Sequence, residues 1–325
     1  MKSFFQSLLT EDVLTKGLSR YSAVSADATE LGAFENIVYK VKKPNNFIVR
    51  FTHSTHRSAS DIQAELEFMD YLFENGVSIP MPRKSKDGSF CEEIEASDGS
   101  SFFVSAFAEA PGKRPTRDDM NPKLWSNWGK QIGKMHRLTK DFKPVHDRIH
   151  WHQEPYYSTP ERYLSKEPIM QERCKNLVSQ ILALPKNADN YGLIHTDVHQ
   201  GNYHIDGDYN LCIFDFDDLA HMHFVHDLAM VVFYGSMFFL PELREEKTQE
   251  MYKFVMDGYS VENTLTNCDL ETMPLFVDLR WIVVTGQLLV LDDPDDTGIM
   301  NQKILNRNVP RINAGEAFIE MNYLI

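Results

Sequence analysis

Two short polar stretches contain the residues of this 325-residue chain whose types and spacing could do chemistry. The first runs from His195 to Asn202 and the second from Asp215 to Asp217. Asp197 supplies a carboxylate, Asn202 an amide five residues later, and Asp215 a second carboxylate thirteen residues beyond that. Carboxylate and amide oxygens are the hard ligands that Mg²⁺ prefers. Phosphoryl transfer from a Mg-bound nucleotide needs such ligands and a further carboxylate that orients the accepting hydroxyl. The spacing therefore indicates phosphoryl transfer.

Apolar residues flank both stretches and predict the elements that would position them. Leu193 and Ile194 run into the first stretch, and the apolar residues 211–214 run into the second. Residues 206–208 (Asp-Gly-Asp) predict a tight turn between them. The expected order is a short strand, a polar loop, a hairpin and another short strand. Because acidic groups at the ends of paired strands can converge, we expect them to share one metal ion.

The remaining hydrophobic pattern predicts an α+β protein whose first hundred residues are β-rich with one helix. Strands and helices are predicted from apolar periods of about two and 3.6 residues. The strands are expected at 36–42, 47–51, 90–94 and 101–107, with a turn at 44–46 and a helix from about 60 to 75. From Asn121 the pattern becomes helical, with amphipathic helices at 124–138 and 168–184 and further helices after Val225.

Composition limits the partners and the compartment. The apolar content of 42% and charged content of 25% are ordinary for a globular protein. A net charge of −14 argues against a nucleic-acid partner and is compatible with an amine-bearing substrate. The four cysteines are far apart without a CxxC pair, so we expect reduced thiols and a cytoplasmic protein.

No membrane or targeting segment is predicted. The apolar residues near the N-terminus are interrupted by Glu11 and Asp12. The apolar runs at 228–240 and 281–291 are too short to span a bilayer and are expected to be buried helices. Nothing in the pattern indicates an oligomeric state.

The polar stretches carry a family resemblance. The pattern H-x-D-x-x-x-x-N at 195–202, D-F-D at 215–217 and H-D-L-A at 226–229 resembles the aminoglycoside phosphotransferase and choline kinase superfamily, whose members are bilobal relatives of protein kinases. Residues 32–39 are similar to the nucleotide-loop segment of that family, and the chain resembles homoserine-kinase-like and stress-response-kinase-like bacterial members most. The resemblance implies a bilobal protein-kinase-like fold, with a β-rich nucleotide-binding lobe at 1–108 and a mostly helical catalytic and substrate-binding lobe at 109–325.

The resemblance implies ATP and Mg²⁺ as cofactors, and it assigns a role to each matching residue of the catalytic stretches. Asp197 would be the catalytic base that orients the substrate hydroxyl and accepts its proton. Asn202 and Asp215 would bind Mg²⁺. Asp227 would brace the backbone of the catalytic loop.

On the nucleotide side, the resemblance implies that Gly32 lies in the nucleotide loop and that Glu65 pairs with the basic residue of a strand. That basic residue is Arg50, where the family usually has a lysine. Arginine binds phosphate through two donors but is not an isosteric replacement, and Lys40 and Lys42 are the alternative phosphate contacts. The segment that includes Val104 and Ala106 would form the hinge whose backbone pairs with adenine.

Other polar and aromatic groups have two interpretations. Asp217 could contact a second Mg²⁺ or serve as a solvated or helix-capping residue. The aromatic residues near Trp151 and Tyr157 could pack a loop or shape a substrate pocket. Four histidines (His204, His221, His223 and His226) raise the possibility of a transition-metal site, but their spacing does not place three of them on one helix face.

The sequence thus predicts an ATP- and Mg-dependent kinase that moves the γ-phosphoryl group to a hydroxyl of a small molecule. The expected acceptor is an amino alcohol, a sugar or an aminoglycoside-like compound, possibly bearing an amine. Alternatives are a protein Ser/Thr kinase on the same scaffold, a metal-dependent phosphoesterase and a non-catalytic nucleotide-binding regulator. The sequence does not choose between ATP and GTP, and it does not name the acceptor.

Overall fold

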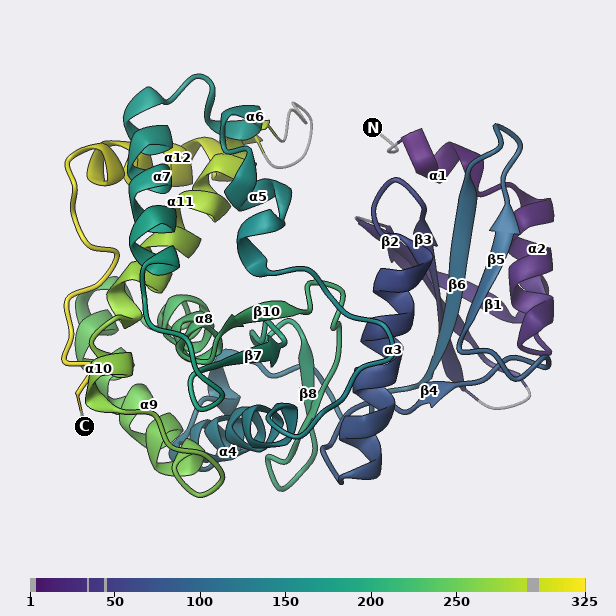
Figure 1. Ribbon diagram of the computed structural model, residues 1–325, viewed down its shortest axis with the longest axis horizontal. Helices are drawn as coiled ribbons and strands as arrows, with labels where there is room; N and C mark the ends of the chain where they lie inside the picture. The colour runs from purple at the N-terminus through teal and green to yellow at the C-terminus, as the bar shows by residue number, and fades with distance from the viewer. Residues whose placement is uncertain (1–3, 34, 44–45, 291–297, 325) are drawn as a thin grey trace. The chain divides into compact units, whose positions relative to one another are not determined.

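A computed structural model describes residues 4–33, 35–43, 46–290 and 298–324 (Figure 1). The chain forms two compact units. Unit 1 comprises residues 1–112, 142–148 and 212–217, and unit 2 comprises residues 113–141, 149–211 and 218–325. The division into lobes at 108/109 stays a prediction. The predicted turn at 44–46 falls on residues 44–45, which lie outside the described part of the chain.

Within its described residues, unit 1 contains a six-stranded antiparallel sheet with the order β1-β2-β3-β6-β4, and β5 also pairs with β6. The strands are β1 (Ala28–Ala33), β2 (Asn36–Val41), β3 (Phe47–His53), β4 (Pro82–Arg83), β5 (Cys91–Glu95) and β6 (Ser101–Ala108). Four of these agree with the predicted strands to within a few residues. The α+β class and the β-rich N-terminal region are confirmed.

Alternation along β3 gives the sheet of unit 1 two different faces. Phe47, Val49 and Phe51 are fully buried in one core cluster together with residues of α2 (Glu11–Arg20). Arg50 lies between them in the sequence, and because successive side chains alternate, it points to the opposite face. Helix α3 (Ala59–Glu74) covers that face (Figure 1). Strand β3 therefore presents a charged residue to one helix and an apolar row to the other.

The prediction of one helix in the first hundred residues is wrong, because α1 (Phe4–Leu8) and α2 precede α3. The Thr10 side chain caps α2 by accepting from the backbone N–H of Val13, and Glu11 and Asp12 favour the positive end of the helix dipole. The ring of Phe51 would lie 2.4 Å from a Cβ at Gly17, so this glycine allows α2 to approach the sheet. This helix start has a recognisable sequence signal in Thr10, Glu11 and Asp12. From the sequence alone, Glu11 and Asp12 are interpreted only as an interruption of an apolar stretch.

Unit 2 is mostly helical. Its described helices are α4 (Pro122–Thr139), α5 (Pro155–Ser158), α6 (Glu161–Leu164), α7 (Pro168–Leu182), α8 (Val225–Ser236), α9 (Arg244–Tyr259), α10 (Asn267–Leu270), α11 (Met273–Val290) and α12 (Gly298–Asn313). Two of them match the predicted amphipathic helices. Helices α4 and α9 cross through glycines: a Cβ at Gly129 would lie 1.8 Å from the carbonyl oxygen of Val255, and one at Gly258 would lie 1.9 Å from that of Ser126. Any larger residue there would force the two helices apart.

The short strands around the catalytic stretches pair differently from the expected arrangement. The predicted hairpin is present, with β8 (Tyr203–Ile205) next to β9 (Leu211–Ile213) and the Asp206 side chain accepting from the turn backbone. Strand β7 (Tyr191–Ile194) instead pairs with β10 (Ala220–His223). The sequence of β10, Ala-His-Met-His, alternates apolar and polar residues over only four positions, and it was not predicted as a strand.

Helix α11 includes the apolar run that the sequence predicted at 281–291, of which residue 291 lies outside the described residues. Within the described chain, the stretch Asn267–Val290 is the one that is long and apolar enough to cross a membrane by length and composition. Half of it (50%) is buried inside the protein, where α11 packs against α7, α8 and α12 (Figure 1). Such burial is typical of a core helix.

Candidate active site

The loop that follows β7 is held in an unusual backbone conformation at Thr196, whose φ of +65° lies in the left-handed region. A β-branched residue rarely adopts this conformation. Three hydrogen bonds hold it there: its N–H donates to Asp227 (2.8 Å), its carbonyl oxygen lies 3.0 Å from His226 Nε2, and its hydroxyl donates to the carbonyl oxygen of Asp218 (2.6 Å). The backbone that carries Asp197 is thereby fixed from both sides.

A buried chain of hydrogen bonds in turn holds Asp227. Asn263 donates to the phenol oxygen of Tyr259 (2.7 Å), so the phenol O–H can donate to His136 Nδ1 (3.0 Å). His136 Nε2 in turn lies 3.0 Å from the Asp227 carboxylate. Burial raises the pKa of Tyr259, which keeps the phenol protonated. Helices α4, α8 and α9 thus fix the catalytic loop through a buried chain of hydrogen bonds that ends on one carboxylate.

Asp197 is a partly buried carboxylate with three donors beside it. Arg280 Nη2 donates to Oδ1, Asn202 Nδ2 lies 3.1 Å from Oδ2, and His199 Nε2 lies 3.3 Å from the same oxygen. Burial alone would raise its pKa, but the charge of Arg280 and the hydrogen bond from His199 outweigh burial and lower the pKa to about 2. Asp197 is therefore ionised at neutral pH. A carboxylate has about four acceptor positions, so about one remains for a further hydroxyl.

Arg280 of α11 and Tyr234 of α8 were not predicted from the sequence. Arg280 Nε and Nη2 donate to the Tyr234 hydroxyl oxygen at 3.0 and 2.6 Å. Burial would lower the pKa of Arg280, but Tyr234 and Asp197 together raise it well above its ordinary value. The sequence offered one signal for Arg280, which directly precedes a long apolar run. A charge that is buried there needs a partner of opposite charge.

In unit 1, the predicted pair between Arg50 and Glu65 is present. Arg50 Nη1 and Nη2 donate to the two carboxylate oxygens at 2.8 and 2.6 Å, and both side chains are buried. Burial would lower the pKa of Arg50, but the paired carboxylate raises it above its ordinary value. Such a bidentate pair fixes the orientation of the guanidinium.

The segment 215–217 is held by cationic side chains that the sequence did not reveal. Asp215 has a φ of +67°. The Asp217 carboxylate lies 2.6 Å from His56 Nε2 and 3.6 Å from Arg57 Nε, and Arg148 Nη2 donates to the Asp217 carbonyl oxygen (2.7 Å). Burial would raise the pKa of Asp217, but the hydrogen bond from His56 and the charges of Arg57 and Arg50 hold it far below its usual range. The prediction of a solvated or helix-capping role for Asp217 is wrong, since this carboxylate is buried and paired.

The predicted nucleotide-loop and adenine contacts have mixed support. Gly32 is an exposed residue of β1 at a register shift, and apart from its chain neighbours no described residue lies within 4 Å of where its Cβ would be. Val104 and Ala106 lie inside β6, whose backbone pairs with strands on both sides. The Val104 carbonyl oxygen also accepts from Tyr21 (2.9 Å). Adenine contact at Val104 and Ala106 stays a prediction, and the pairing of their backbones argues against it.

A small, partly open pocket lies beside the catalytic loop within unit 2. It is lined by Trp151, Glu154, Tyr156, Tyr157, Thr196, Asp218, Ala220, Met222 and Arg280. Trp151 is buried and packs edge-on against Tyr157, with 5.2 Å between ring centroids. The aromatic cluster therefore does both things that the sequence allowed: it packs a loop, and it shapes a pocket.

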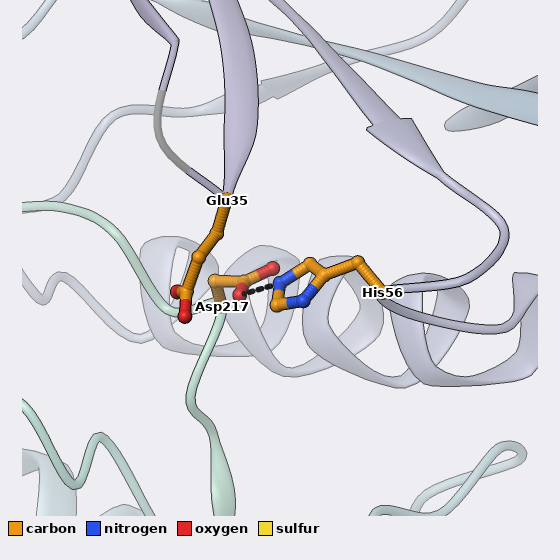
Figure 2. Close-up of side chains that lie close together, drawn as sticks. All are labelled: Glu35, His56 and Asp217. Carbon is orange, nitrogen blue, oxygen red and sulfur yellow. Dashed lines mark hydrogen bonds and ion pairs between the residues drawn. The ribbon is translucent and has the colours of Figure 1, made fainter. Parts of the chain in front are cut away.

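The four crowded histidines do not form the transition-metal site that was considered. None of the four belongs to a group of three ligand atoms within 4.8 Å of one another in the described chain. Among the described residues, the group with metal-ligand spacing is instead Glu35, His56 and Asp217 (Figure 2).

The comparison with protein families identifies the class of protein. Residues 27–259 match the model of the phosphotransferase enzyme family, and the chain belongs to that family. A relative from Bacillus subtilis (strain 168), the amicoumacin kinase, is 30% identical over 303 residues, which cover 91% of this chain and 89% of the relative. The predicted family resemblance and the prediction that the protein is a kinase are confirmed.

Solved structures confirm the protein-kinase-like fold. The amicoumacin kinase hAmiN, in complex with AMP-PNP, Ca²⁺ and Ami, superposes with a TM-score of 0.93 at 27% identity and covers 99% of both chains. A microcompartment-associated aminopropanol kinase gives a TM-score of 0.76 at 18% identity, covering 94% of this chain and 98% of its own. Nucleotide and divalent-cation binding, the general part of the cofactor prediction, is supported by the ligands in such complexes.

Proposed function

We propose that the protein transfers the γ-phosphoryl group of ATP to a hydroxyl of a small amine-bearing molecule, with Asp197 as the base. The observation that carries this proposal is the state of Asp197. It is ionised, its loop is fixed by Thr196 and Asp227, and about one acceptor position is open beside a pocket. A carboxylate of such low pKa is a weak base, so its main contribution is to orient the hydroxyl, with proton transfer late in the reaction.

Magnesium is the proposed cation, held by Asn202 and Asp215. The donor set fits, because a carboxylate and an amide oxygen are hard ligands. The Asn202 amide nitrogen donates to the backbone oxygen of Asp197 (3.0 Å) and to its carboxylate (3.1 Å), so the amide oxygen is the atom that would face a cation. When bound, Mg²⁺ would neutralise charge on the nucleotide phosphates.

Arg50 is the proposed phosphate contact in place of the usual lysine. Its two terminal nitrogens donate to Glu65, but its Nε has no hydrogen-bond partner among the described residues. A buried, oriented donor without a partner is a suitable position for a phosphate oxygen. The alternative Lys40 pairs with Glu109 at 2.6 Å, which weakens the case for it.

The pocket in unit 2 is the proposed acceptor site. Two carboxylates, those of Glu154 and Asp218, and the rings of Tyr156 and Tyr157 line it. Carboxylates pair with ammonium groups, and aromatic faces attract them. An amine-bearing substrate with a hydroxyl directed at Asp197 fits this lining. Since the relative with 30% identity is an amicoumacin kinase, amicoumacin is the first acceptor to test.

The test is a screen with radiolabelled ATP and Mg²⁺ against amicoumacin, amino alcohols, sugars and aminoglycosides. We expect label on one amine-bearing class. Asp197→Asn should lower kcat by about 10²–10⁴-fold with little change in the Kd for ATP. The exposed Asp257→Asn on α9 is the matched control and should leave kcat unchanged.

Two outcomes would contradict the proposal. Label that appears only on protein would indicate a protein kinase instead. An Asp197→Asn variant that turns over at the wild-type rate would remove the assignment of the base.

A further inference from the structure

Three potential metal ligands of unit 1 come from three separate segments and meet at one place. Glu35 follows β1, His56 lies in the turn after β3, and Asp217 ends the acidic stretch. One ligand atom from each lies within 4.8 Å of the other two. Figure 2 shows the Asp217 carboxylate between the Glu35 carboxylate and the His56 imidazole.

Only one of the two oxygens of the Asp217 carboxylate has a hydrogen-bond partner among the described residues. Its Oδ2 contacts His56 Nε2 at 2.6 Å, while Oδ1 is buried and has no hydrogen-bond partner among the described residues. The residue is 4% exposed. Burying a charged oxygen without a hydrogen-bond partner costs free energy of folding, and such an oxygen often binds a water molecule or an ion.

We propose that Glu35, His56 and Asp217 bind one divalent transition-metal ion, separate from the magnesium proposed at Asn202 and Asp215. One imidazole nitrogen and two carboxylate oxygens form the mixed donor set that suits Zn²⁺ or Mn²⁺ better than Mg²⁺, which favours oxygen alone. Ligand atoms around tetrahedral Zn²⁺ are about 3.4 Å apart, given metal–ligand bonds of about 2.1 Å. To bind such an ion, the distance of 2.6 Å between His56 Nε2 and Asp217 Oδ2 must increase slightly. The longest distance between ligand atoms, which is at most 4.8 Å, must decrease. Rotation of the half-buried Glu35 side chain allows this change.

Nearby arginines limit the strength of this site. The two carboxylates carry two negative charges, but Arg57 Nε lies 3.6 Å from Asp217 and Arg50 acts on it at longer range. These cations already offset part of the charge that would attract the ion. We therefore expect micromolar binding, much weaker than in closed structural zinc sites. The bound ion would join the end of β1, the turn after β3 and the acidic stretch.

The test is titration of the full-length protein with ZnCl₂, without nucleotide, by isothermal titration calorimetry. We expect one site per chain with micromolar affinity in the wild type. His56→Gln and Glu35→Gln should each weaken its Zn²⁺ binding by about 10–100-fold. His146→Gln is the matched control, because His146 Nδ1 contacts Glu67 at the same 2.6 Å, in the same unit, but this pair belongs to no group of three ligands in the described chain. It should bind Zn²⁺ like the wild type.

A second measurement keeps the test valid if the His56 variant folds poorly. Mn²⁺ added to the wild type should show ¹⁴N coupling from a coordinated imidazole in pulsed electron paramagnetic resonance, which the oxygen donors at Asn202 and Asp215 cannot give. Equal Zn²⁺ affinity in the wild type and in folded His56→Gln would overturn the proposal, and so would no Zn²⁺ binding below about 100 μM. Loss of the site in Asp215→Asn with retention in His56→Gln would also overturn it, because the ion would then occupy the proposed magnesium site. None of these results depends on which acceptor is phosphorylated.

Discussion

The two acidic stretches that the reaction needs are held in opposite ways. The segment 215–217 of unit 1 is surrounded by Arg50, Arg57 and Arg148, whose charges do not change in any ordinary pH range. The catalytic loop of unit 2 is held in part by His226, a buried imidazole whose pKa burial lowers to about 4. Fixed charges stabilise an acidic segment over a wide pH range, whereas a neutral imidazole does so only until it is protonated. The two stretches should therefore lose their structure under different conditions.

The largest effect is expected at the Arg50–Glu65 pair. Arg50→Ala leaves the Glu65 carboxylate buried without its partner, which should lower the free energy of unfolding by about 3–5 kcal/mol. Arg50→Lys keeps a charge but loses the bidentate geometry, so it should be milder in stability and still raise KM for ATP. Urea unfolding and steady-state kinetics measure the two effects.

The control for this prediction is Lys16→Ala, because the Lys16–Asp12 pair is exposed (59% and 69%) and should contribute no more than about 1 kcal/mol. If Arg50→Ala cost as little as the control, the fixed-charge description of unit 1 would be wrong.

The second prediction concerns acid. His223 and His226 have pKa values of about 4 in the folded protein, against 6.5 when unperturbed. Between these values the unfolded chain binds more protons, so the free energy of unfolding should fall as pH drops from about 6.5 to about 4, by up to about 3 kcal/mol for each histidine. Asp217 has the opposite sign: its lowered pKa stabilises the protein at every pH above about 4, and this contribution is lost only below that value.

Urea unfolding between pH 7 and pH 4.5 measures the acid effect. His223→Phe keeps a ring against Phe276 and removes one titrating group, so its stability should depend less steeply on pH. Hydrogen exchange then separates the two stretches: at pH 5, after correction for intrinsic rates, residues 195–202 should lose protection while residues 215–217 keep it. Equal loss in both stretches would contradict the comparison.

The same two stretches show how far sequence alone reaches. The Arg50–Glu65 pair was predicted from the family resemblance and is present. The short spacing of Asp197 and Asn202 likewise agrees with the hydrogen bond between their side chains. Strand β10 could not be predicted, since it is only four residues long and is specified by its partner β7. The adenine contact of Val104 and Ala106 stays a prediction, and the sequence does not reveal that β6 has neighbours on both sides.

The supporting side chains were missed for a different reason. Arg280 lies 83 residues from Asp197 along the chain, and His56 lies 161 residues from Asp217. No local pattern joins residues so far apart. Only the tertiary fold brings them together, and a buried charge in an apolar helix is the single hint that one sequence offers.

The third prediction tests Arg280, a fixed charge beside Asp197, the proposed base. Arg280→Gln removes the main interaction that lowers the pKa of Asp197, so that pKa should rise from about 2 by about 1–3 units. A carboxylate of higher pKa loses its charge at higher pH, and the acid limb of kcat/KM should therefore move up into the range between pH 4 and 6. The control is Arg311→Gln, which breaks an exposed pair with Glu316 and should leave the pH profile unchanged. An unmoved acid limb in Arg280→Gln would mean that Arg280 does not set the charge of Asp197.

The smallest effect is expected at Tyr234, which acts on Asp197 through Arg280. Tyr234→Phe removes the hydroxyl oxygen that accepts from Arg280 Nε and Nη2, but it leaves the guanidinium and its contact with Asp197 in place. Loss of one hydrogen-bonding group of this kind is worth about 1 kcal/mol, so kcat/KM should fall by about fivefold. Tyr252→Phe is the matched control: its hydroxyl donates to the Tyr323 carbonyl oxygen at 3.1 Å in the same unit, and its loss should lower stability without changing kcat/KM. Equal kcat/KM for the two variants would show that Arg280 is oriented by its helix alone. The Tyr234 hydroxyl would then make no contribution to the position of Asp197.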